Sequence, residues 1–144
     1  MLNITEMANE LNELTAWQET PLPLTAEDYI KIVKRAVRDF FVDINRPAEF
    51  STDKYIVVGS GDDEQVFYDR EFLIDEEVYI LILCKIEFFQ RVQTDVNNAF
   101  GYTTNALTVT NADKPYKNLA ETLNGLYNER RIKFNKMVRY TLGE

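Results

Sequence analysis

The chain has 144 residues, of which 45% are hydrophobic, so it is long enough for a single domain with a core of its own. Acidic residues outnumber basic ones by 24 to 16, and the net charge of −8 disfavours a general nucleic-acid binder, which needs a basic footprint. The absence of histidine excludes Ser–His and Cys–His nucleophile systems and imidazole metal ligands. The one cysteine, Cys84, excludes an internal disulfide and is expected to be a small buried hydrophobe.

Residues 1–24 are predicted to be an N-terminal arm and linker, and residues 25–144 a single helical domain. The arm begins with a short acidic helix whose narrow apolar stripe contains Ile4, Met7, Leu11 and Leu14. Because the stripe is narrow, we expect this helix to need a neighbouring surface. Pro21 and Pro23 then enforce an extended link.

The first main helix is predicted over residues 25–44. Thr25 and Asp28 have the spacing of a capping box, and apolar residues then repeat at helical spacing as far as Ile44. The other side of this helix is basic and carries Lys31, Lys34, Arg35 and Arg38. Such a face is ordinarily solvated, and the alternative is contact with phosphate or an acidic partner.

A β-hairpin is predicted over residues 54–68, with strands Tyr55–Val58 and Gln65–Tyr68. The acidic residues near its turn are Asp62, Asp63 and Glu64. They lack the alternating oxygen ligands and the closing glutamate of an EF-hand loop, so no metal site is expected there. We expect an exposed acidic tip that is either solvated or in contact with a basic partner, such as another subunit.

The most apolar run, Val78–Phe89, is predicted to lie in a buried central helix over residues 75–97. Asp75 is the expected cap, and two further acidic residues follow in the first turn, where the helix dipole favours negative charge. The run is too long for an average strand and contains neither Gly nor Pro, although its β-branched residues leave a central strand as the alternative. A helix that is apolar nearly all round must be wrapped by other elements.

Residues 99–113 are predicted to be a polar loop that pairs with an edge of another copy or stays irregular, and residues 114–141 the last helix. Its second half is basic, with Arg130, Arg131, Lys133, Lys136 and Arg139. Cations complement the negative end of the helix dipole, but five cations in ten residues exceed that need. Two interpretations therefore remain open: the cations stabilise the end of the helix, or they contact an acidic protein surface or passing DNA.

These elements predict a mainly α fold: a bundle of three main helices (25–44, 75–97 and 114–141), a β-hairpin insertion (54–68) and an N-terminal helical arm. Gly59-Ser60-Gly61 is not followed by a helix and lacks the lysine of a phosphate-binding loop. No group of residues forms a catalytic constellation, so we expect a protein that is not an enzyme and has no cofactor. No run reaches the length of a membrane span and no signal-peptide pattern begins the chain, so we expect it to act in a reducing interior or in an assembly built there.

The layout resembles that of the helical head–tail connector proteins of long-tailed bacteriophages, also called adaptor or head-completion proteins. The resemblance covers about residues 24–141 and is carried by LTAEDYI (24–30), VYILIL (78–83), ALTV (106–109), KPYKNL (114–119) and YNERR (127–131). The arm and the hairpin are not part of the family pattern.

The resemblance implies a structural virion protein that forms a ring, commonly of twelve copies, beneath the portal. Such a ring extends the DNA channel and joins the capsid to the stopper or tail. The implied partners are copies of the chain, the portal protein, a stopper or tail-completion protein, and double-stranded DNA that passes without specific binding; no membrane is implied. The implied location is the head–tail neck of the virion, after assembly in the host cytoplasm.

In this family the C-terminal segment tends to engage the portal, which implies a portal contact at Arg139, Tyr140, Thr141 and Leu142. The alternative function is a small helical regulator that binds DNA through the basic faces of the first and last main helices. Against this alternative stand the net charge and the lack of a short helix-turn-helix, since the two basic helices are far apart in the sequence.

Overall fold

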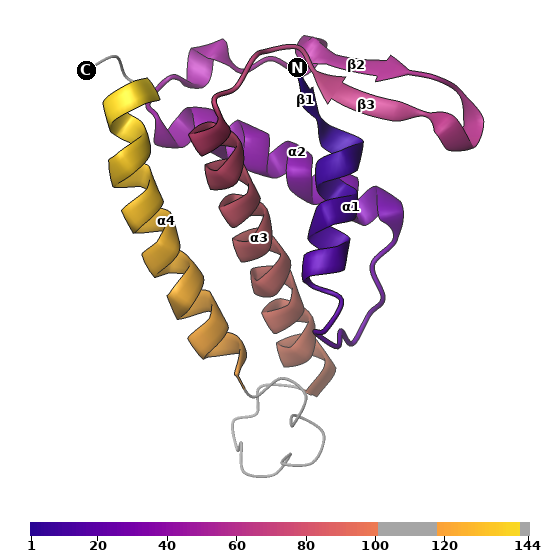
Figure 1. Ribbon diagram of the computed structural model, residues 1–144. Helices are drawn as coiled ribbons and strands as arrows, with labels where there is room; N and C mark the ends of the chain where they lie inside the picture. Colours follow the sequence, from indigo (N-terminus) through magenta and orange to yellow (C-terminus); the bar gives the residue numbers. More distant parts are fainter. Residues whose placement is uncertain (101–117, 142–144) are drawn as a thin grey trace.

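The computed structural model describes residues 1–100 and 118–141, with side chains over 1–98 and 118–138. The described part is mainly helical, with helices α1 (Ile4–Leu14), α2 (Ala26–Asp43), α3 (Ile74–Phe100) and α4 (Leu119–Thr141). An antiparallel sheet has the strand order β1-β3-β2, formed by β1 (Leu2–Asn3), β2 (Tyr55–Val58) and β3 (Gln65–Tyr68). Figure 1 shows α3 in the centre, with α4 and α1 on its two sides and α2 crossing behind. The predicted class, a small helical bundle with a β-hairpin, is confirmed.

The helix α3 occupies the segment where a strand was the alternative, so the strand interpretation is wrong. The predicted cap, Asp75, is also wrong. The backbone N–H of Leu73 donates to the Glu76 carboxylate at 2.9 Å, and the Leu73 carbonyl accepts from the N–H of Glu77 at 3.0 Å. Leu73 therefore takes the cap position, and the Asp75 side chain points to α4 instead.

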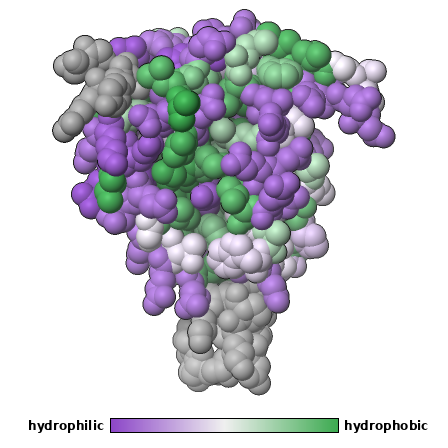
Figure 2. Space-filling model, in the orientation of Figure 1, coloured by the Kyte–Doolittle hydropathy of each residue, from purple (hydrophilic) through white to green (hydrophobic). Residues whose placement is uncertain are grey.

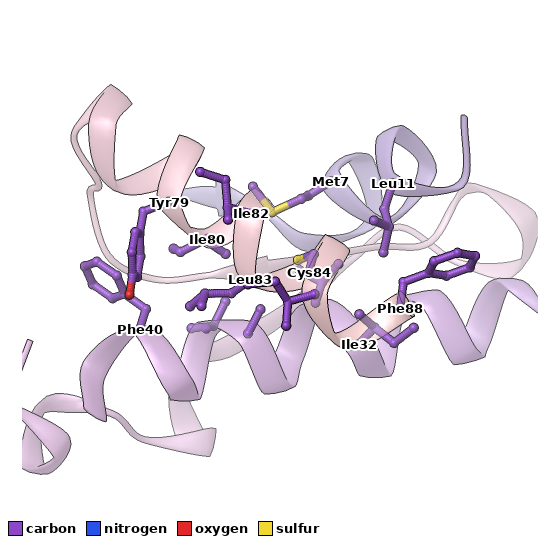
Figure 3. Packing of buried hydrophobic residues seen from close by; sticks show 14 of the residues in the cluster. Met7, Leu11, Ile32, Phe40, Tyr79, Ile80, Ile82, Leu83, Cys84 and Phe88 are labelled. Carbon is purple, nitrogen blue, oxygen red and sulfur yellow. The ribbon is translucent and has the colours of Figure 1, made fainter. Parts of the chain in front are cut away.

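The core is built around α3, whose side chains lie between those of α1 and α2 (Figure 3). Met7 and Leu11 reach it from α1, and Ile32 and Phe40 from α2. The fully or almost fully buried hydrophobic side chains of α3 itself are Tyr79, Ile80, Ile82, Leu83, Cys84, Ile86, Phe88, Phe89 and Val92. Cys84 is fully buried, as predicted, and its burial raises the pKa of the thiol, which keeps it protonated and unreactive.

The first 14 residues were predicted to belong to an arm, but they pack into the same core as the rest of the chain. Ile4 and Leu11 are fully buried, and Leu2 in β1 pairs with Tyr68 in β3. The surface that the narrow apolar stripe requires is supplied by α2 and α3 of the same chain. The predicted boundary at residue 24 therefore does not separate two packing units.

The hairpin has the predicted strands, with Tyr55 opposite Tyr68 and Val58 opposite Gln65. Its connection contains a short 3-10 turn, Gly61–Asp63, and a positive φ of 89° at Gly59, where an added Cβ would lie 2.6 Å from the Asp63 carbonyl oxygen. An aromatic cluster joins the hairpin to α2 and contains Phe40, Phe41, Phe50, Tyr55, Tyr68 and Phe72. The third strand, β1, was not predicted, because two residues carry no period that a sequence reveals.

The start of the loop before α4 differs from the prediction. Residues 99 and 100 are the last residues of α3, although they were assigned to the loop. The described part of α4 begins at Leu119, and the predicted start at residue 114 lies outside the described residues, as does most of the predicted loop.

Replacing Ile80 with Asp is expected to abolish cooperative folding, because Ile80 is fully buried and the new carboxylate would have no partner. The same replacement at Val78, which is 41% exposed on the uncovered side of α3, is expected to cost about 1 kcal/mol at most. Urea unfolding followed by circular dichroism compares the two variants. Equal losses of stability would contradict the structure, in which α3 is rotated so that Ile80 faces the core and Val78 faces solvent.

Candidate interaction surfaces

The basic cluster predicted on the last helix is divided by the fold. Arg130 points inward, and its guanidinium contacts the Asp43 carboxylate at 2.7 Å, so it joins α4 to the end of α2. The hydroxyl of Tyr79 in α3 donates to the same carboxylate at 2.6 Å and accepts from Arg130 Nε at 3.3 Å. Three helices therefore meet at one ion pair with a shared tyrosine.

The hydroxyl of Tyr79 keeps its proton at any ordinary pH. Burial raises the pKa of Tyr79, and the hydrogen bond that its hydroxyl donates to the Asp43 carboxylate raises that pKa further. Because the hydroxyl stays neutral, it remains a hydrogen-bond donor to Asp43 and does not act as a base. This arrangement fixes the position of α4 and supplies no reactive group.

Lys133 is also engaged within the chain, since its ammonium contacts the Asp75 carboxylate of α3 at 2.7 Å. Arg131 and Lys136 are exposed, and Arg131 donates to Asn128 on its own helix at 2.7 Å. Of the four predicted cations whose side chains are described, two therefore bind neighbouring helices and two face outward. The predicted portal residues Arg139, Tyr140 and Thr141 lie outside the described side chains, and Leu142 lies outside the described residues.

The acidic tip of the hairpin is exposed, as Asp62, Asp63 and Glu64 all face solvent. The hairpin projects from the end of the bundle, on the side away from α4 (Figure 1). Its strand β2 is an edge of the sheet, and Ile56, Val57 and Val58 on it are exposed. An open edge with exposed apolar side chains is a surface on which a further strand or another protein can pack.

The predicted basic face of α2 is present. Lys31, Arg35 and Arg38 are exposed on the side opposite to the buried residues of the helix. Lys34 instead lies over the Tyr55 ring, with its ammonium 5.0 Å from the ring centroid. Two acidic neighbours partly offset this face through ion pairs, Lys31 with Glu27 at 3.9 Å and Arg38 with Asp39 at 3.8 Å. The hollow beside Lys31 and Arg35 also contains Asp28, Glu87 and Asp95, so the cations of α2 are bordered by carboxylates.

An exposed apolar surface on α3 was not predicted, because the sequence analysis expected this helix to be wrapped on all sides. Leu73, Ile74 and Val78 are exposed, Ile74 by 80%, and Leu81 is half-buried. Ile74, Val78 and Leu81 follow the helical spacing i, i+4 and i+7, so they form one stripe along the helix. Figure 2 shows hydrophobic side chains over the first half of α3 and on the hairpin. The signal was present in the sequence, but an all-apolar helix does not reveal which side stays uncovered.

Acidic side chains lie beside this stripe. A shallow hollow between the start of α1 and α3 is lined by Glu6, Glu10 and Glu77, together with Met7 and the first residues of the chain. We call the apolar stripe and these three carboxylates the α3 face.

Within residues 1–98 and 118–138, no group of three or more acidic or cysteine side chains is placed to hold a metal ion. No helix in the described ranges combines the length and hydrophobicity that crossing a bilayer requires. Comparison with family models, with curated proteins and with solved structures finds no match to this chain.

Replacing Arg130 with Ala is expected to destabilise the fold by about 1–2 kcal/mol, because it leaves the Asp43 carboxylate partly buried without its cation. Arg131→Ala removes the same charge from an exposed neighbouring position and is expected to change stability by about 0.5 kcal/mol or less. The free energies of unfolding in urea measure both. An Arg131→Ala variant as unstable as Arg130→Ala would show that the ion pair has no special role.

Proposed function

We propose that this chain is a structural subunit of a phage head–tail connector, forming a ring beneath the portal that joins the capsid to the stopper or tail. The observation that supports the proposal is the distribution of the side chains. The strongest internal polar contacts hold helices together, while exposed apolar groups gather on the α3 face and on the open edge of the hairpin. Such a distribution favours protein contacts over a chemical reaction.

A ring is also favoured because one side of the molecule exposes the apolar stripe of α3 and the other exposes the cations of α2. A chain that presents one kind of surface on one side and another kind on the other side associates head to tail, and a head-to-tail contact that closes makes a ring. The net charge of −8 suits a channel through which DNA slides, because a basic lining would hold the duplex by its phosphates.

The second candidate is the DNA-binding regulator, which the exposed cations of α2 favour: Lys31, Arg35 and Arg38. The second basic face that this regulator requires, on α4, has fewer free cations than the sequence indicated. Arg130 and Lys133 are already bound to carboxylates of the same chain. A duplex-binding protein would show strongly salt-dependent affinity for double-stranded DNA.

The mass of the purified chain, measured with and without the portal protein of the same phage, tests the proposal. We expect ring-sized particles or assembly that depends on the portal, and no salt-sensitive binding to duplex DNA. Deleting residues 139–144 is expected to prevent portal docking while circular dichroism stays unchanged, because the deletion spares the described core.

A matched control replaces Asp62 and Asp63 of the hairpin tip with Asn, which changes an exposed surface at the far side of the molecule from α4. We expect this variant to dock on the portal like the parent chain. A monomer or dimer that ignores the portal and binds duplex DNA would replace the connector proposal with the regulator. Normal docking by the truncated chain would remove the portal contact from the C-terminal segment.

A further inference from the structure

We propose that the α3 face of one copy binds the basic face of α2 on the next copy. The inference names the partner surface of the ring proposed above, and it rests on that proposal only in requiring that copies of the chain associate. Three observations support it: the positions of the two surfaces, their matching length, and their opposite charges.

The two surfaces lie on opposite sides of the molecule. On α2, Ile32, Val33 and Phe40 are buried toward α3 and α1, so the exposed side of that helix points away from them. On α3, the uncovered stripe around Val78 is about half a turn from Leu83, which is buried. Figure 1 shows α2 crossing behind α1 and α3, and Figure 2 shows the apolar stripe on the near side. A single copy therefore cannot satisfy one surface with the other, whereas a neighbouring copy can.

The two surfaces also have the same helical spacing and length. The basic row on α2 runs through Lys31, Arg35, Arg38 and Val42, and the row on α3 runs through Ile74, Val78, Leu81 and Lys85. Each row follows the positions i, i+4, i+7 and i+11, which span roughly 16 Å along a helix. One row therefore matches the other along its whole length.

The chemistry of the two rows is complementary. Lysine and arginine carry apolar stems, which can cover the exposed side chains of Ile74 and Val78, while their charged ends reach the carboxylates alongside. Those carboxylates are Glu6, Glu10 and Glu77. Arg35 is exposed, so its guanidinium is accessible to a neighbouring copy.

The one cation in the α3 row, Lys85, fixes the direction of the match. If the two rows run the same way, Lys85 lies beside Val42, which is uncharged and 55% exposed. If they run in opposite directions, Lys85 lies beside Lys31, and like charges oppose each other at the interface. The parallel arrangement is therefore the favoured one.

The contact is tested with charge reversals of the full chain, measured by sedimentation over a range of concentrations. Reversing the basic face (Arg35→Glu with Arg38→Glu) or the acidic rim (Glu10→Lys with Glu77→Lys) is expected to raise the dissociation constant of self-association at least about tenfold, because like charges then face each other. A chain that carries all four changes is expected to recover association. Matched controls that should associate like the parent chain are Arg131→Glu with Lys136→Glu and Glu121→Lys with Glu129→Lys, all at exposed positions of α4.

Mixing the two single-face variants gives the sharpest result. The intact surface of each variant faces the intact surface of the other, and the two reversed surfaces are again opposite in charge. The mixture is therefore expected to recover growth as an assembly of alternating copies, while each variant alone stays dissociated. Cooperative thermal unfolding of every variant confirms that the fold survives.

A parent chain that stays monomeric at all concentrations would overturn the inference, as would face variants that associate as well as the parent. Portal docking distinguishes this failure from that of the proposed function. A chain that docks on the portal but associates through another surface would overturn only the contact. A chain that associates through these two faces but ignores the portal would overturn only the connector proposal.

Discussion

The structure depends on the burial of α3 by its neighbours. Its apolar side chains, such as Ile80 and Phe88, have no access to water, and each contributes about 1.5–3 kcal/mol when it is removed from solvent. A helix of this composition cannot stand alone, and α1, α2 and α4 each depend on it or on one another for the surface they bury. The hairpin is attached to the same core through aromatic side chains, above all Tyr68, which is fully buried.

The polar contacts inside the molecule determine how the helices are placed. The contacts of Arg130 with Asp43 and of Lys133 with Asp75 fix α4 against α2 and α3 at two points along its length. Each is partly exposed and therefore contributes modestly to stability, but it selects one rotation of an otherwise weakly amphipathic helix. These charges are therefore used within the chain, and the exposed side chains include apolar ones on the first half of α3 and cations on α2.

Much of this architecture follows from local sequence signals. The capping box at Thr25, the period of α2 and the strands beside Gly59 all agree with the structure, because capping, periodicity and turn chemistry act within a few residues. The position of α1 was not predictable, since a narrow stripe does not show which surface will cover it. The roles of Arg130 and Lys133 were hidden for a similar reason: a run of cations looks the same whether its partners are solvent, another protein or Asp43 and Asp75 of the same chain.

Hydrogen exchange of the backbone amides under native conditions tests the central place of α3 most directly. If burial of this helix holds the fold together, the amides of residues 79–92 exchange only through global unfolding and are the slowest of the described chain. The hairpin around Val57, with its open edge and exposed side chains, exchanges through local opening and is faster. Exchange in α3 as fast as in the hairpin, while α2 stays protected, would contradict the account.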